Sequence, residues 1–234
     1  MQTITTVITA THMTTDTLSN EGQQSYIKDP HTIEQESFNR IRSLSNLTAF
    51  DNDQAQIAMR LIHTCGNPEI SDVIRISEQA VTSGLQAIAN NSPILCDVEM
   101  VKHGLTKRMI KQDVHCYLND ERVPELAKQQ SETRTMAALR YWKPHIEGSI
   151  VLIGNAPTAL FRLMEMIQAG SPKPALIIGV PVGFVGAAES KDALIAFGDK
   201  HSIPYITVTG FVGGSAMTAA AFNALLRLSN NIRF

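Results

Sequence analysis

The chain has 234 residues, of which 44% are hydrophobic and 18% are charged, so it is long enough to bury one sizeable core. No apolar stretch reaches the length of a membrane span, and the N-terminus lacks the basic flank and apolar core of a secretory signal. The formal net charge of −2, without a basic cluster, argues against a nucleic-acid-binding surface. We therefore expect a cytoplasmic protein that binds neither membranes nor nucleic acid.

The cysteines and histidines show no metal-binding pattern. Cys65, Cys96 and Cys116 are odd in number and form no CxxC pair, so we expect buried thiols rather than disulfides or a zinc knuckle. The histidines show neither HxH nor HExxH spacing. The sequence therefore predicts no metal site and no cofactor.

The N-terminal third divides into a polar tail and a helical region. Residues 1–25 are rich in Thr, Ser, Gln and Asn, which is typical of a disordered tail. A single domain is then expected over residues 26–234, beginning with three helices. The first opens at Asp29 and Pro30, the second runs from about residue 51 to Cys65, and the third covers about 77–89.

From Pro93 onward, short apolar runs alternate with helical segments. The expected strands cover residues 94–98, 114–118, 149–153, 175–180 and 204–208, and the expected helices cover 99–103, 121–142 (broken), 156–169, 187–197 and 215–228. Because the strands are apolar on both faces, they favour an α/β fold: an open, mostly parallel sheet with helices on both faces. In such a fold the ligand crevice lies beyond the carboxyl ends of the strands.

A repeated glycine motif falls at that crevice. Gly-Phe-Val-Gly occurs at residues 183–186 and again at 210–213, each time between an apolar run and a helical segment. Glycines permit positive φ and let a ligand lie against bare main chain, while the following helix presents free N–H groups. The motif predicts a small-molecule site, most suited to an anion.

Arg60 and His63 lie three residues apart, so they share a helix face near the helix C-terminus. The helix dipole raises the pKa of a histidine there, whereas burial or the guanidinium lowers it, and such competition can suit an acid or base. The alternative is a hydrogen-bonded core histidine beside a surface arginine. The pattern alone favours this second interpretation.

Other polar residues are also open to two interpretations. Asp97 and Glu99 could form an acid and base pair, or a carboxylate could simply cap the following helix. Arg134 could grip a substrate carboxylate or pair with Glu132 in solvent. Serine hydrolases, Walker-type nucleotide sites and dinucleotide-binding turns are disfavoured because the GxSxG, P-loop and GxGxxG motifs are missing.

The motifs taken together resemble the precorrin-8X methylmutase family. The segments that carry this resemblance are YIKDP (26–30), ESF (36–38), RLIHTCG (60–66), PILCDVEMV (93–101), TRTMAA (133–138), GNAPTALF (154–161), GVPVGFVGAAESK (179–191) and GGSAMTAAA (213–221). The resemblance extends from Tyr26 to about Leu228. Its C-terminal blocks are long and distinctive.

The resemblance implies an isomerase of cobalamin (vitamin B12) biosynthesis that moves a methyl group from C11 to C12 of precorrin-8X without an external methyl donor. The product would be hydrogenobyrinic acid or its cobalt-containing counterpart; the segment 96–100 favours the metal-free form. The resemblance also implies that His63 is the proton donor and acceptor, that Ser37 and Arg60 contact the substrate, and that Thr106 and Arg134 belong to the pocket. A homodimer with sites near the subunit interface is a further implication.

This chemistry agrees with the residue patterns. One well-placed acid can make a conjugated macrocycle electron-poor and so assist a 1,5-sigmatropic methyl shift, while the protein holds the ring. The predicted cradle consists of the GNAP and GFVG turns, with Asn155, Gly183, Gly186, Gly213 and Gly214 as substrate-binding residues. Two alternatives stay open: a carrier that retains a tetrapyrrole without converting it, and a nucleotide-binding domain.

Overall fold

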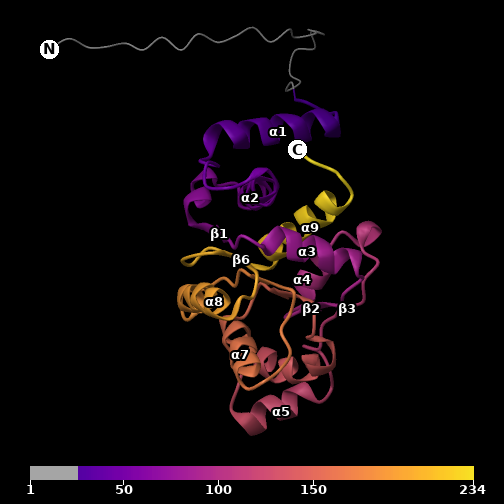
Figure 1. The fold of residues 1–234 in the computed structure, drawn as a ribbon, viewed down its shortest axis with the longest axis vertical. Helices are drawn as coiled ribbons and strands as arrows, with labels where there is room; N and C mark the ends of the chain where they lie inside the picture. The colour runs from indigo at the N-terminus through magenta and orange to yellow at the C-terminus, as the bar shows by residue number, and fades with distance from the viewer. Residues whose placement is uncertain (1–25) are drawn as a thin grey trace, which may run out of the picture.

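The structure, a computed structural model, describes residues 26–234 (Figure 1), so the tail predicted over residues 1–25 lies outside the described residues. The α-helices are α1 (Pro30–Leu44), α2 (Asn52–Cys65), α3 (Ala80–Ala89), α4 (Glu99–Gly104), α5 (Val123–Gln130), α6 (Arg134–Ala138), α7 (Pro157–Gln168), α8 (Ala187–His201) and α9 (Ser215–Ser229). Three 3-10 helices are η1 (Pro68–Val73), η2 (Lys107–Met109) and η3 (Leu139–His145). The strands are β1 (Ile74–Ile76), β2 (Ile94–Cys96), β3 (Val114–His115), β4 (Ile150–Ile153), β5 (Leu176–Gly179) and β6 (Tyr205–Val208).

The first two helices begin and end where local chemistry dictates. The Asp29 carboxylate accepts a hydrogen bond from the Thr32 N–H at 2.7 Å, and Pro30 opens α1. Asp51 caps α2 through a complete capping box with Gln54. Gly66 ends α2 in the left-handed conformation with φ of 68°, which costs glycine little.

The six strands form one sheet in the order β1-β6-β5-β4-β2-β3. All neighbouring pairs are parallel except β1 with β6, which is antiparallel. The parallel strands β2, β4, β5 and β6 therefore all direct their carboxyl ends to one edge of the sheet. The predicted α/β fold with an open, mostly parallel sheet is confirmed.

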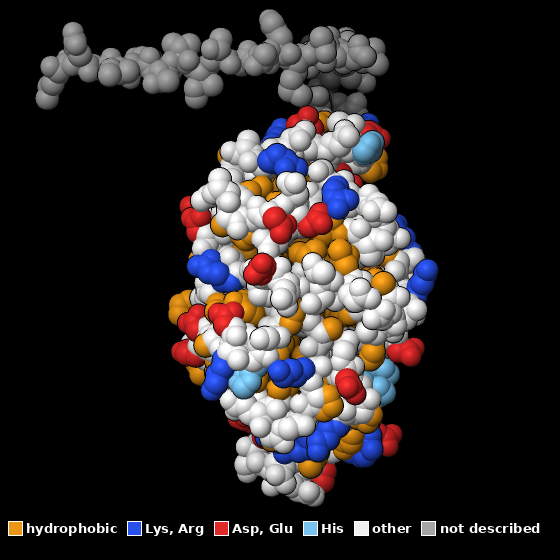
Figure 2. Space-filling model, viewed as in Figure 1, with side chains coloured by type: hydrophobic (Ala, Val, Ile, Leu, Met, Phe, Trp, Pro, Cys, Tyr) orange, Lys and Arg blue, Asp and Glu red, His pale blue; other side chains and the backbone are white. Residues whose placement is uncertain are grey.

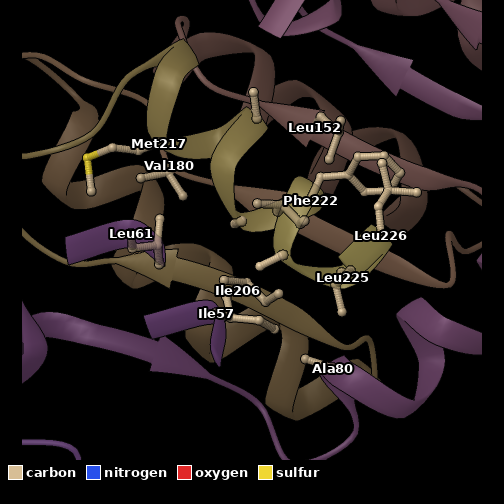
Figure 3. Packing of buried hydrophobic residues seen from close by; sticks show 14 of the residues in the cluster. Ile57, Leu61, Ala80, Leu152, Val180, Ile206, Met217, Phe222, Leu225 and Leu226 are labelled. Carbon is tan, nitrogen blue, oxygen red and sulfur yellow. The ribbon is translucent and has the colours of Figure 1, made fainter. Parts of the chain in front are cut away.

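Alternate strand residues face two separate cores. On one face, Ile150 and Leu152 of β4 pack with α2, α3, α4 and α9, and Phe222 of α9 lies at the centre of this layer (Figure 3). On the other face, Val151 and Ile153 pack with α7, α8 and η3. Burial on both sides explains why these strands are apolar throughout.

The first two helices form a cap beyond the sheet layer. In Figure 1, α1 lies across α2, and α2 lies against α9, which itself covers the sheet. Ile57 and Leu61 of α2 are fully buried against α9 (Figure 3), and Phe38 anchors α1. The cap is thus continuous with the main core, as expected for a single domain.

The structure corrects three details of the sequence prediction. The N-terminal third is not wholly helical, because Ile74–Ile76 forms β1; three residues are too few for a periodic signal, and the pairing with β6 is long-range. The strand predicted at 114–118 is only Val114–His115. Of the three cysteines predicted to be buried, Cys96 is buried, Cys116 is only partly buried and Cys65 is exposed.

The surface shows no dominant charge on the face seen in Figure 2, where basic and acidic side chains are interspersed. Among the described helices, none is long and apolar enough to cross a membrane.

Candidate active site

His63 lies in the last turn of α2 and faces α1. Its Nδ1 is 3.0 Å from the Ser37 hydroxyl, and its ring stacks on Phe38 with 5.2 Å between centroids. Within residues 26–234, no group hydrogen-bonds its Nε2. Because Ser37 engages one ring nitrogen, the other is left to exchange a proton with a ligand.

Its environment makes His63 more acidic than an ordinary histidine. Partial burial lowers the pKa of His63, the Arg60 guanidinium lowers it further, and Glu34 acts in the opposite direction. A lowered pKa makes the imidazolium a stronger proton donor, although a smaller fraction is protonated at neutral pH. The exposed, hydrogen-bonded ring therefore differs from the core histidine that the pattern alone favoured.

Arg60 lies one turn before His63 over two aromatic rings. Its guanidinium carbon is 5.5 Å from the centre of the Phe38 ring and 4.9 Å from that of the Phe234 ring. Its Nη2 is 4.0 Å from a carboxylate oxygen of Glu34. Burial lowers the pKa of Arg60, and the neighbouring Arg227 lowers it further. Arg60 and Arg227 share the carboxylate of Glu34, so these three side chains together carry a net positive charge.

A groove of about 330 Å³ runs along α9 beside these residues. Its lining combines three arginines with small and polar side chains: Arg60, Thr64, Gly104, Thr106, Arg108, Met109, Ala216, Ala219, Ala220, Asn223 and Arg227. Guanidinium groups pair well with carboxylates, and the alanines leave space for a flat molecule. The groove suits a carboxylate-bearing ligand.

Thr106 lies in this groove, as the predicted site requires. Its N–H donates to the Asn223 side chain at 2.9 Å, and Asn223 donates in turn to the Gly104 carbonyl. These bonds tie the segment after α4 to α9. Arg60 and Thr106 therefore share one groove, although they come from distant parts of the chain.

The two GFVG turns lie side by side because β5 and β6 are neighbouring parallel strands. Gly183, Gly186 and Gly214 have φ of 148°, 78° and 126°, conformations that favour glycine. A side chain on Gly213 would approach the Val180 carbonyl within 2.4 Å. Glycine is therefore required at these turns for both conformation and space.

The same turns leave backbone donors and apolar side chains free. Within the described residues, the N–H groups of 184–186 and 211–213 donate to no protein acceptor. Phe184 and Val185 are 86% and 90% exposed, and Phe184 lies 5.6 Å from Phe211. Such a surface can contact an apolar ring and its anionic substituents.

Lys191 connects α8, the helix after the first GFVG turn, to the second GFVG turn. Its side chain is fully buried, and its ammonium donates to the Val212 carbonyl at 2.8 Å. Burial lowers the pKa of Lys191 to about 8. A buried cation near a helix N-terminus is unfavourable, so Lys191 lowers the free energy of unfolding, while its hydrogen bond fixes the second GFVG turn.

The main-chain donors of the GNAP turn (154–157) are used within the protein. The buried Asp97 carboxylate accepts from the N–H groups of Gly154, Asn155 and Ala156 at 3.1, 2.9 and 3.0 Å. Burial raises the pKa of Asp97, while these hydrogen bonds oppose the rise. The turn presents the exposed Asn155 side chain to solvent.

Neither interpretation of Asp97 and Glu99 is correct. Asp97 does not cap the following helix, because α4 has no side-chain cap, and it is committed to the GNAP turn instead. Glu99 contacts His103 on α4 at 3.5 Å. The two carboxylates therefore do not form an acid and base pair.

Arg134 is separated from Ser37, Arg60 and His63 within one chain. It opens α6, next to α5 at the opposite end of the molecule from α1 and α2 (Figure 1), and donates to the Leu118 carbonyl at 3.0 Å. Glu132 pairs with Arg140 rather than with Arg134. The structure thus brings Ser37, Arg60 and His63 together, and leaves Arg134 apart from them.

Sequence analysis missed several groove residues. Asn223 and Arg227 continue the stripe begun by Ala216 and Ala219 or Ala220 at helical spacing along α9, which is a signal that periodicity could have revealed. Lys191 carries no such signal. No cluster of three or more His, Cys, Asp or Glu residues within 26–234 could hold a metal ion.

The fold and these groups define a class: an α/β domain with a mostly parallel sheet, a helical cap and an arginine-lined groove along α9. The family model described as precorrin-8X methylmutase matches residues 32–228. The chain therefore belongs to the precorrin-8X methylmutase family.

Individual relatives agree with this assignment. The chain is 50% identical to a precorrin-8X methylmutase of Pseudomonas aeruginosa, over 86% of this chain and 96% of the relative. It is 37% identical to a cobalt-precorrin-8 methylmutase of Leptospira interrogans, over 85% and 93% of the two chains. The solved structure of a precorrin-8X methyl mutase from Thermus thermophilus superimposes with a TM-score of 0.77 at 35% identity, covering 86% and 97%.

Proposed function

We propose that the protein is an isomerase of cobalamin biosynthesis that converts precorrin-8X to hydrogenobyrinic acid by moving a methyl group from C11 to C12. Membership of the family supports this activity. The observation that carries the mechanism is the Ser37–His63 contact of 3.0 Å beside a groove lined by arginines.

His63 supplies the proton in this mechanism. Its imidazolium gives a proton to the conjugated macrocycle, which becomes electron-poor, and the methyl group then migrates within the ring system. The neutral imidazole recovers the proton from the rearranged ring. No proton is consumed, and Ser37 keeps the imidazole oriented throughout.

The remaining task is to hold a large, flexible ring, because the reaction is unimolecular. Arg60 and Thr106 bind carboxylate arms of the substrate in the groove. Gly183, Gly186, Gly213 and Gly214 present the main chain to the ring, and the Asn155 side chain adds a polar contact. Apolar side chains of the GFVG turns cover the macrocycle.

The metal-free substrate is favoured over the cobalt form. The two relatives named precorrin-8X methylmutase are 50% and 48% identical to this chain, whereas the cobalt-precorrin-8 relative from Leptospira interrogans is 37% identical. Incubating the protein with each substrate form and recording the absorption spectrum tests this choice. An orange corrin product from the cobalt form alone would reverse it.

We also propose that the protein acts as a homodimer. A bound ring or a second chain could cover the exposed Phe184 and Val185, and Arg134 can share one site with Ser37, Arg60 and His63 only if they belong to another subunit. Sedimentation equilibrium tests this: a monomer would contradict it. The cytoplasmic location and the lack of nucleic-acid binding remain predictions from the sequence.

The decisive experiment replaces His63 by Ala and measures both conversion of precorrin-8X and binding of hydrogenobyrinic acid. Loss of one general acid should lower turnover by about 10²- to 10⁴-fold while binding stays tight. Near-normal turnover in the variant would refute the assignment of His63. Tight binding without turnover by the wild-type protein would instead indicate a tetrapyrrole carrier.

A further inference from the structure

The residues after α9 fold back over the helical cap. The Phe234 N–H donates to the Gln56 side chain at 2.7 Å, and its carbonyl accepts from Arg42 at 3.2 Å. Arg233 pairs with Asp53 at 2.9 Å. These contacts fix residues 232–234 against α1 and α2, although the family model matches only residues 32–228.

The ring of Phe234 extends the aromatic stack that holds His63. Phe234 and Phe38 are 3.5 Å apart between ring centroids at an interplanar angle of 8°. The other neighbour of Phe38 in the stack is His63, at 5.2 Å and 15°. Phe38 therefore stacks with two rings that come from other parts of the chain.

The same ring also contacts both arginines at the end of the groove. The guanidinium carbons of Arg227 and Arg60 lie 4.3 and 4.9 Å from the centre of the Phe234 ring. Two guanidinium groups this close repel each other, and Glu34 supplies one carboxylate for both. An aromatic face attracts cations, so the Phe234 ring can help to hold two guanidinium groups close together.

We infer that Phe234 is a positioning residue, which fixes Arg60 and Arg227 in the groove and supports the imidazole of His63 through Phe38. The inference rests on the proposed function for the identity of the ligand. It makes the segment after α9 part of the site, beyond the stretch that the family model covers. Because Phe38 remains against His63 without Phe234, the main effect should fall on substrate binding rather than on the chemical step.

The test compares Phe234→Leu and Phe234→Met with Phe234→Trp. We measure the Kd for hydrogenobyrinic acid by absorbance titration, KM and kcat with precorrin-8X, and the thermal midpoint of each variant. Loss of two cation–π contacts should raise Kd and KM by about five- to thirty-fold with kcat changed less than about three-fold. Tryptophan supplies an aromatic face and should restore Kd to within about two-fold.

Arg233→Ala is the comparison variant, because it removes the neighbouring ion pair with Asp53, one of several contacts that hold the segment, and keeps the aromatic ring itself. It should raise Kd by clearly less than Phe234→Leu does. The inference is overturned if the Leu and Met variants bind like the wild type, if Arg233→Ala weakens binding equally, or if tryptophan fails to restore binding. A wild-type protein that binds without turnover would refute the isomerase proposal, yet the Kd comparison would still decide the role of Phe234.

Discussion

The helical cap and the carboxyl edge of the sheet contribute different chemistry to the candidate site. The cap supplies ionisable side chains, His63 and Arg60, held by aromatic stacking and by the Ser37 hydroxyl. The sheet edge supplies main chain at the GFVG turns, in conformations that favour glycine. Lys191 hydrogen-bonds the second of these turns, and Asp97 hydrogen-bonds the GNAP turn beside them. If His63 transfers the proton and the sheet edge holds the ring, as we propose, substitutions in the two regions should have separable effects.

The largest expected effect at the sheet edge comes from Asp97→Ala, because three buried N–H groups lose their acceptor. We expect a loss of about 3–5 kcal/mol in the free energy of unfolding. Urea denaturation measures this. Asp97→Asn keeps one oxygen acceptor and should lose less; a loss below about 1 kcal/mol in Asp97→Ala would show that the turn does not depend on Asp97.

Arg60→Met tests the cap by removing a charge without shortening the side chain much. Charge-assisted hydrogen bonds to a carboxylate arm should be lost, raising Kd for hydrogenobyrinic acid by about 10- to 100-fold. Titration by absorbance gives the value. Arg40→Met, on the exposed side of α1, is the control, and equal effects in both variants would remove Arg60 from the site.

Lys191→Met should stabilise the sheet edge at neutral pH by about 1–2 kcal/mol, because an apolar side chain replaces a buried cation. Burial lowers the pKa of Lys191 from 10.5 to about 8. Between these values the unfolded chain binds a proton that the folded chain does not, so wild-type stability rises with pH. The advantage of the variant should therefore shrink from pH 8 to 10.5.

Thermal unfolding across this pH range provides the measurement. Lys200→Met, at the exposed end of α8, keeps Lys191 and should follow the pH dependence of the wild type. A destabilised Lys191→Met variant would mean that the bond to Val212 outweighs the cost of burying the charge.

Glu34→Gln should have the smallest effect, a shift in the pH profile of turnover. Burial and Arg60 lower the pKa of His63, and the Glu34 carboxylate partly opposes them. Without that carboxylate the pKa of His63 falls further. If protonated His63 is the acid, kcat/KM declines as pH rises through this pKa, so the decline should move to lower pH.

Glu36→Gln, on the same helix, is the matched control. An unshifted profile in Glu34→Gln would show that another group limits the rate, and a shift to higher pH would contradict the proposed role of His63 as an acid.

Sequence reasoning succeeded where local chemistry determines structure. Asp29 and Pro30 open α1, and Gly66 ends α2, because capping and φ preferences act within a few residues. The apolar parallel strands followed from burial on both faces. The placement of Ser37 beside His63 agrees with the family resemblance, which already encodes tertiary contacts.

The features that sequence reasoning missed depend on distant partners. Asp97, which follows β2, binds the GNAP turn after the neighbouring strand β4. β1 pairs with β6, which is distant from it in the sequence. Phe234 stacks on Phe38 from nearly the opposite end of the chain. None of these pairings leaves a periodic or capping signal in a single sequence, so only the folded chain reveals them.

The most direct test of the account is a crystal structure of the protein with hydrogenobyrinic acid. We predict that the ring lies against the turns at 183–186 and 210–213, with an imidazole nitrogen of His63 from the same or a partner subunit about 3–4 Å from the macrocycle. A ring bound elsewhere, or one beyond the reach of every His63, would contradict the division between a cap that moves the proton and a sheet edge that holds the ring.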